Sequence, residues 1–327
     1  MKKIYSLFLL LLVSVAGSCL YAEQFDSIVG GINYWFDTED SSAMVIYKNH
    51  YYDEWSTGND YNGDIVIPEW VSMDDTVPFE VNKIDWKAFN ESGVTSVSIP
   101  NSVTNIYPGA FAKCYMLNKV TLSENLTSLS DEIFYHCSNL VSVSIPEGVT
   151  YIGNYAFTLC EKLPIIAIPQ SVEYIGDSAF TACKKLVSFD IPERVISVGD
   201  GVLKDCKKLT YLTISASVIS IGDWAFAGCE RLLSVTNHAL TPQTISADVF
   251  EGVDKTACTL YVPAESVELY RNALVWKDFT HIEPIEQTEG MDNVSYKASQ
   301  TSKLLRDGQL FILRGNRIYT LIGQEIQ

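Results

Sequence analysis

The sequence predicts a repeat solenoid of the α/β type, in which short parallel strands stack coil upon coil and turns or short helical segments close each coil. The prediction rests on three sets of residues that recur every 23 positions. The repeated cysteines are Cys114, Cys137, Cys160, Cys183, Cys206 and Cys229. The repeated aliphatic residues are Ile99, Leu122, Ile145, Ile168, Ile191 and Ile214. The repeated aromatic residues are Phe111, Phe134, Phe157, Phe180 and Phe226, with Leu203 in one unit and Phe89 and Phe250 extending the series slightly out of register.

Each unit follows the pattern I-P-x-x-V-x-x-I-G-x-x-A-F-x-x-C-x-x-L-x-x-V-x. Its segment L-x-x-V-x-I, as in Leu140, Val143 and Ile145, has the period-two alternation of a short strand with one buried face. Pro146 then ends the strand, because proline cannot continue a hydrogen-bonded ladder. A single coil has too little surface to close a core, so the coils must stack and equivalent residues must form columns.

The period and the L-x-x-V-x-I segment resemble a leucine-rich repeat, and the motif I-P-x-x-V-x-x-I-G-x-x-A-F-x-x-C resembles the BspA-like subclass of bacterial surface proteins. The resemblance covers roughly residues 67 to 262. It implies a solenoid with its strands on the concave face and its irregular or short helical turns on the convex face. It also implies that the concave sheet binds partners.

The regions outside the repeats predict caps, a linker and an export segment. Residues 34–36 and 45–47 predict two strands of an N-terminal cap, and Val267, Tyr270 and Leu274 have the spacing of a closing helix. The predicted divisions are a signal peptide at 1–22, an N-terminal cap at 23–66, the solenoid at 67–262, a C-terminal cap helix at 263–285, a linker at 286–302 and a β-hairpin tail at 303–327.

The hairpin tail places two apolar strands around Gly315 and Asn316, a favourable turn pair. Its sequence resembles the C-terminal tails of Bacteroidetes surface proteins, some of which serve as type IX secretion signals. The two interpretations are a sorting signal and a small terminal sheet.

The first residues predict export. Lys2 and Lys3 precede an apolar run over 4–16 that is shorter than the ~20 residues of a membrane-spanning helix, and no other segment comes close. Two cleavage sites compete. Residues 16–19 resemble a lipobox that would anchor the chain through a lipid on Cys19, whereas 20–22 suit an ordinary signal peptidase. We therefore expect a protein at the outer-membrane surface or outside the cell, without a transmembrane span.

Composition narrows the possible partners. Forty acidic residues against 23 basic ones give a net charge of -17, which repels a phosphate backbone and makes nucleic acid an unsuitable partner. The sequence contains no H-E-x-x-H, G-x-S-x-G or phosphate-loop motif, and its four histidines are isolated. We expect no enzyme, no cofactor and no metal site.

Two surfaces are candidate ligand sites. The first is the outward side of the predicted concave strands, rich in hydroxyl groups: Ser142, Ser144, Ser188, Asp190, Tyr211, Thr213, Ser234 and Thr236. The second is a basic ridge next to the repeat cysteines: Lys162, Lys184, Lys185, Lys207, Lys208 and Arg231. An anionic ligand would neutralise the ridge, although Glu161 and Glu230 are also candidate ion-pair partners. Solvated charge and a crowded polar sheet are the structural alternatives for the two surfaces.

Two further columns have structural interpretations. The cysteines are expected to be free buried thiols, because side chains within one column point in parallel and no C-x-x-C pair is present. Acidic or amide side chains three positions before the Phe position of five units predict N-caps of short helical turns. They are Asp131, Asn154, Asp177, Asp200 and Asp223.

These observations predict an exported, non-enzymatic recognition protein, an adhesin-like binder of an extracellular protein through its solenoid. The alternatives are a glycan-binding surface protein that assists polysaccharide capture, and a structural spacer. The identity of the protein or glycan ligand is not encoded in any motif.

Overall fold

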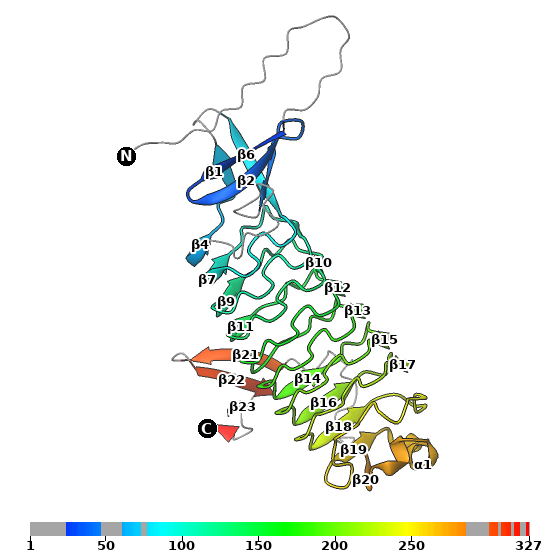
Figure 1. Cartoon of the computed structure of the whole chain (residues 1–327). Helices are drawn as coiled ribbons and strands as arrows, with labels where there is room; N and C mark the ends of the chain where they lie inside the picture. Colours follow the sequence, from blue (N-terminus) through cyan, green and yellow to red (C-terminus); the bar gives the residue numbers. More distant parts are fainter. Residues whose placement is uncertain are drawn as a thin grey trace, which may run out of the picture. The chain divides into compact units, whose positions relative to one another are not determined.

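The computed structural model describes residues 24–46, 61–72, 77–285, 301–306, 309–314, 317–320 and 325–326. The chain forms two compact units, which divide between Ile285 and Glu286. The first is a solenoid of stacked parallel strands with little helix, which confirms the predicted fold class (Figure 1). The expected signal peptide, Cys19 and the turn at Gly315 and Asn316 lie outside the described residues.

One row of parallel strands follows the L-x-x-V-x-I segments, as the alternation predicts. We call it the first strand row. It consists of two sheets in the orders β4-β7-β9-β11 and β14-β16-β18-β19-β20. The strands are β4 (Asn62–Val66), β7 (Gly93–Ser98), β9 (Lys119–Thr121), β11 (Ser142–Val143), β14 (Ser188–Asp190), β16 (Tyr211–Ile214), β18 (Ser234–Asn237), β19 (Thr259–Val262) and β20 (His281–Pro284).

Proline explains why the first strand row is interrupted. Val141 donates its backbone N–H to Asn118 in the preceding coil, and Val187 donates likewise to Pro164 (N···O 3.0 and 3.1 Å). Pro164 occupies the equivalent position in the coil between them and has no N–H to donate. The ladder therefore lacks a bond at this coil, and residues 164–168 form no strand. The alternation pattern alone does not reveal the break.

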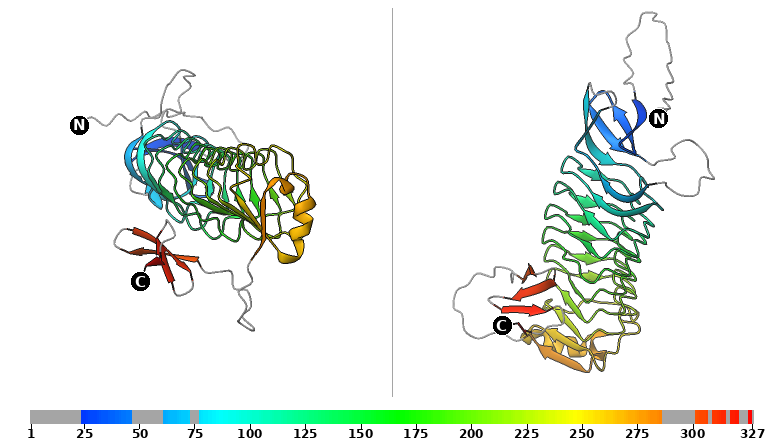
Figure 2. Two further views of the ribbon diagram at one scale, coloured as in Figure 1. Left: turned by 90° about the horizontal axis from the view of Figure 1, so that it is seen from below. Right: turned by 90° about the vertical axis from the view of Figure 1, so that its left-hand side faces the viewer.

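A second row of two-residue strands lies on another side of the coils, a feature that the sequence analysis did not predict. These strands pair in the order β10-β12-β13-β15-β17, and Figure 1 labels them on the side of the coils away from the first strand row, which the right-hand view of Figure 2 faces. They are β10 (Ser128–Leu129), β12 (Tyr151–Ile152), β13 (Tyr174–Ile175), β15 (Ser197–Val198) and β17 (Ser220–Ile221). Each ends before the turn that carries the A-F pair. A coil is therefore fastened to its neighbours on two sides.

A sheet of mixed direction closes the N-terminal end. Its order is β1-β2-β3-β6-β5, and β8 pairs with β6. The strands are β1 (Gln24–Val29), β2 (Ile32–Asp37), β3 (Ser42–Val45), β5 (Trp70–Ser72), β6 (Pro78–Ile84) and β8 (Asn105–Ile106). Tyr34, Phe36 and Phe79 are buried, and the rings of Phe36 and Phe79 meet edge to face at 4.9 Å. This sheet covers the apolar columns that a terminal coil would otherwise expose.

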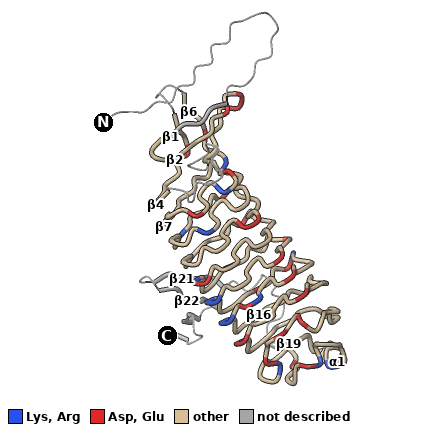
Figure 3. Tube along the Cα trace, viewed as in Figure 1, with Lys and Arg blue, Asp and Glu red and all other residues tan. Residues whose placement is uncertain are grey.

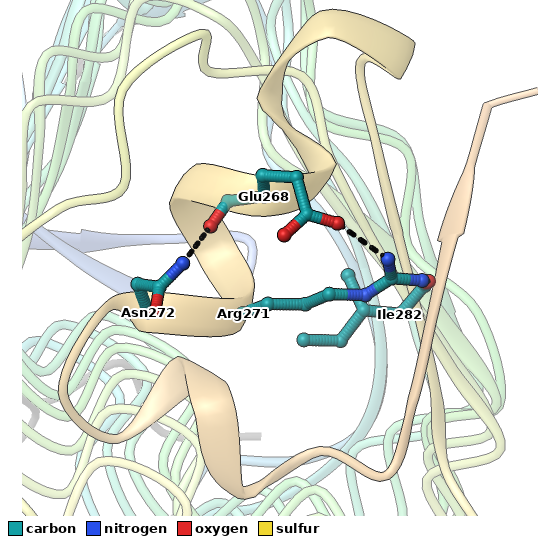
Figure 4. A network of polar contacts seen from close by, with 4 residues as sticks. All are labelled: Glu268, Arg271, Asn272 and Ile282. Atoms are coloured by element: carbon teal, nitrogen blue, oxygen red, sulfur yellow. Dashed lines mark hydrogen bonds and ion pairs between the residues drawn. The ribbon is translucent and has the colours of Figure 1, made fainter.

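Short helices cover the other end of the solenoid. They are the 3-10 helix η1 (Ala264–Ser266), the α-helix α1 (Val267–Asn272) and the 3-10 helix η2 (Trp276–Asp278). Arg271 pairs with Glu268 at 2.6 Å and donates to the carbonyl oxygen of Ile282 in β20 at 3.3 Å (Figure 4). Trp276 is buried and donates from its indole nitrogen to the carbonyl of Gln243 at 2.8 Å. These contacts fasten the helices to the last coils.

The second unit is a small antiparallel sheet in the order β21-β22-β23-β24. Arg314 is the partner of Arg317 where β22 and β23 meet. The strands are β21 (Thr301–Arg306), β22 (Gln309–Arg314), β23 (Arg317–Thr320) and β24 (Glu325–Ile326). No helix among the described residues is long and apolar enough to cross a membrane.

The core is a stack of repeated side chains. The rings of Phe157 and Phe180 stack at 5.2 Å with an interplanar angle of 5°. Where Leu203 replaces the next ring, Phe189 of β14 packs edge-on against Phe180 at 4.9 Å and supplies the missing aromatic neighbour. The seven described cysteines from Cys114 to Cys258 are free and buried, which confirms the prediction of free thiols.

The repeat cysteines also form a hydrogen bond in each coil. Each repeat thiol donates to a backbone carbonyl in the preceding coil, as Cys183 does to Phe157 at 3.3 Å. Burial raises the pKa of Cys183 to about 12, so the thiol keeps the proton that it donates. Cysteine is therefore a small apolar side chain that also joins one coil to the next.

Candidate functional site

The acidic column is structural, but its mechanism differs from the one predicted. Asp177 Oδ1 accepts the backbone N–H of Asp200, the equivalent residue of the next coil, at 2.9 Å. Asn154 and Asp200 do the same for Asp177 and Asp223, each at 2.8 Å. The prediction of helix N-caps is therefore wrong, because these side chains bond between coils and the residues that follow them form turns.

This bond explains the repeated glycine. A Cβ at Gly199 would lie 2.6 Å from Asp177 Oδ1 and 2.8 Å from the Asp177 nitrogen, so no side chain fits there. Position 130, which is equivalent to the repeated glycines, carries serine. The residue of the preceding coil that is equivalent to Asp177 is Pro108, which has no carboxylate. At the far end, Asp223 accepts from the Ser246 hydroxyl at 2.7 Å, and the residue before Ser246 is Ile245. Glycine thus occurs at the positions where an Asp or Asn Oδ1 accepts a backbone N–H from the next coil.

The predicted concave-face residues lie in the first strand row and are accessible to solvent. Ser142 lies in β11 and Ser144 just after it, on the N-terminal side of the break at Pro164. The other six lie in β14, β16 and β18, where Ser188, Tyr211 and Ser234 are in register, as are Asp190, Thr213 and Thr236. The structure therefore brings six of the eight together on one continuous sheet.

The register extends both lines of side chains beyond the predicted set. Thr259 and His281 continue the line of Ser234, and Tyr261 and Glu283 continue the line of Thr236. We call these two lines of five residues the sheet face. The four additional residues could not be predicted from equal spacing, because the last coil is longer than 23 residues.

The predicted basic ridge consists of two columns with different environments. Lys184 pairs with Glu161 in the preceding coil at 2.6 Å, and Lys207 pairs with Glu230 in the following coil at 2.8 Å. We call these two lysines the paired column. Both glutamates lie one repeat length from their lysine, so stacking brings each pair together.

The remaining four basic residues form the second column, which we call the unpaired column. It consists of Lys162, Lys185, Lys208 and Arg231, one from each of four successive coils. All four are exposed, and none has an acidic partner within the described part of the chain. Lys185, with a smaller contribution from Arg231, lowers the pKa of Lys208, because a neighbouring positive charge disfavours the protonated amine. Figure 3 shows basic positions in neighbouring coils beside β16.

The described residues hold no group of three or more histidine, cysteine, aspartate or glutamate side chains placed to bind a metal ion. The stacked Tyr151 and Tyr174 are the most regular aromatic pair on the surface, with parallel rings 4.9 Å apart. They lie in the second strand row and not on the sheet face.

Comparisons with known proteins agree with this geometry. A solved leucine-rich repeat protein from T. pallidum is similar, with 25% sequence identity, a TM-score of 0.52, and coverage of 64% of this chain and 91% of its own. A solved leucine-rich repeat protein from Bacteroides ovatus has 20% identity, a TM-score of 0.50, and coverage of 80% and 77%, and it shows the fold alone. No curated protein matches the chain.

The family model for the BspA type leucine rich repeat region, present in six copies, matches residues 82–210 and 155–275. The matched region contains the cysteine, phenylalanine and aspartate columns, both columns of the basic ridge and most of the sheet face. The family indicates a recognition role. The chain belongs to the BspA-type leucine-rich repeat proteins of bacteria.

Proposed function

We propose that this chain is an exported, non-enzymatic recognition protein of the bacterial surface, an adhesin-like module that binds an extracellular protein through its sheet face. One observation carries the proposal. Five paired strands, from β14 to β20, hold two registered lines of solvent-accessible side chains that the core does not use. Such a surface is stiff, so a partner pays little entropy to order it.

The chemistry of the sheet face suits a protein partner. Tyr211 exposes 55% of its surface at the second strand of the five, and Tyr261 adds an aromatic ring in the neighbouring line. Hydroxyl groups of Ser234, Thr213 and Thr236 lie around the two rings in the register. Tyrosine surrounded by small polar residues is typical of energetic centres in protein interfaces.

The apolar N-terminal run and the bacterial surface proteins of the family support export. Fractionation of the cells that make the protein, followed by protease treatment of intact cells, tests this part. Recovery in the outer-membrane or extracellular fraction is expected, whereas retention in the cytoplasm would overturn it.

Binding is tested with the mature chain from Glu23 against immobilised, purified extracellular-matrix proteins. Tyr211→Ala is expected to weaken binding about tenfold or more, because loss of a central aromatic anchor costs ~2 kcal/mol. Tyr174→Ala is the matched control, since Tyr174 is 41% exposed but lies in the second strand row. Equal losses in the two variants, or no binding to any matrix protein, would contradict the proposal.

A further inference from the structure

We propose that the unpaired column, Lys162, Lys185, Lys208 and Arg231, is a second binding site, which holds a linear anionic polysaccharide with one acidic group on each sugar. This site borders the sheet face, and its ligand is different. The proposal does not depend on a protein ligand for the sheet face.

The two columns of the basic ridge differ in their ion pairs. Lys184 and Lys207 are neutralised by glutamates in adjacent coils. Lys185 and Lys208 are the next residues along the chain, yet stacking places them beside each other and beside Arg231. Like charges held side by side raise the free energy of the folded state unless an anion lies between them. The unpaired column thus keeps its charge available for an external ligand.

The charges of the unpaired column are regularly spaced. The four cations come from equivalent positions in successive coils, so they lie along the solenoid axis at about the spacing of paired strands, ~4.8 Å. A polysaccharide with an acidic group on every sugar presents its charges at a comparable regular interval. A non-repetitive acidic protein surface lacks such a regular interval, which is why we favour the polysaccharide.

Polar side chains of the sheet face lie next to the unpaired column. Ser188, Tyr211 and Ser234 lie three residues after Lys185, Lys208 and Arg231 in the same coils, and they form the nearer line of the sheet face. Hydroxyl groups and an exposed ring beside cations can bond and stack with sugar units. The carboxylate of Asp190 lies in the farther line, away from the column.

The net charge of -17 sets a condition on the ligand. Salt screens the repulsion between the acidic protein and a polyanion at separations beyond ~10 Å. At contact, the unpaired column attracts the polyanion. Binding therefore requires several simultaneous contacts, and short oligomers should bind poorly.

The experiment measures binding of the full mature chain to polygalacturonate oligomers of defined length by calorimetry. Affinity is expected to rise with length until an oligomer spans the four coils and then to level off. The double variant K185Q/K208Q is expected to weaken binding about tenfold, which is ~1.4 kcal/mol, because it removes two exposed ion pairs with the ligand. Thermal unfolding verifies that the variant is folded.

The double variant K184Q/K207Q is the matched control, because it removes the same charge from the adjacent residues of the same coils. It is expected to change affinity less than K185Q/K208Q does. Equal losses would mean that binding follows net charge alone and would overturn the site. Absence of binding to polygalacturonate, equal binding of its neutral methyl ester, or tighter binding of poly-glutamate would overturn the assigned ligand class.

Discussion

The same coils carry an acidic stack, which is the Asp and Asn column, and the basic unpaired column. The solenoid supplies bonding partners for the first and not for the second. In the acidic stack, Asp131, Asp177 and Asp200 each accept a backbone N–H from the next coil. In the unpaired column, Lys185 and Lys208 face each other without an acidic partner among the described residues. Stacking creates repulsion in both cases. A repeated charged residue therefore stabilises the fold where the next coil supplies a hydrogen-bond partner for it. Where no coil supplies one, the residue stays available to a ligand.

The largest predicted effect tests the acidic stack through its glycine. Gly199→Ala places a methyl group 2.6 Å from Asp177 Oδ1 and should reduce the free energy of unfolding by about 2 kcal/mol, the usual cost of overpacking. Chemical denaturation measures the change. A double-mutant cycle with Asp177→Ala should give a less than additive loss, because the carboxylate is part of the clash. Strict additivity would show that the two positions are independent.

The next effect concerns the carboxylate alone. Asp177→Ala removes the acceptor for the Asp200 N–H and should cost about 1 kcal/mol. Asp177→Asn keeps the Oδ1 acceptor, as Asn154 does naturally one coil earlier, and should be nearly neutral. Thermal melts of the two variants decide the matter. If asparagine destabilises as much as alanine, the charge and not the hydrogen bond is what the column needs.

A smaller effect is expected in the basic columns. Without ligand, Lys185→Gln should raise the melting temperature slightly, because it relieves repulsion from Lys208. Lys184→Gln should lower it slightly, because it leaves Glu161 without its partner. Opposite signs at adjacent residues would support the distinction between the columns. High salt should reduce both differences.

The smallest effect is a difference in titration. The pKa of Lys207 is raised by its bond to Glu230, whereas the pKa of Lys208 is lowered by Lys185, relative to the ordinary 10.5. As the pH rises, Lys208 releases its proton earlier in the folded state than in the unfolded state, so its contribution to stability increases. The contribution of Lys207 is present below 10.5 and is lost as the pH rises through its raised pKa. Side-chain NMR measures both values, and identical titration curves would contradict the assignment.

The repeated columns could be predicted from the sequence, because equal spacing in a stacked repeat places equivalent residues of successive coils next to each other. The strands of the first row and the buried state of Cys183 follow from alternation and stacking. Lys184 and Glu161 lie one repeat apart, so even their contact is implied by the period.

Other features depend on backbone conformation, which spacing does not encode. Two turn positions in each of the six regular repeats are left-handed, as at Tyr155 (φ 56°) and Leu159 (φ 62°), and they exclude the helical turn on which the N-cap prediction rested. The second strand row is only two residues wide, too short for a periodicity signal. The C-terminal residues of the sheet face, including His281, follow a lengthened coil. They therefore do not recur at the 23-residue spacing that marks the other members.

The proline in the first strand row has a further consequence for how the molecule unfolds. Coils in a solenoid interact only with their neighbours, so its cooperativity is set by the weakest junction. The junction between Val141 and Pro164 lacks a bond that the equivalent junctions have. We therefore expect partial unfolding to begin or end at this junction. Amide hydrogen-exchange rates should then differ between the coils before Pro164 and the coils after it. The proposed sheet face and three of the four cations of the unpaired column belong to the later block, and could remain folded as the N-terminal coils open.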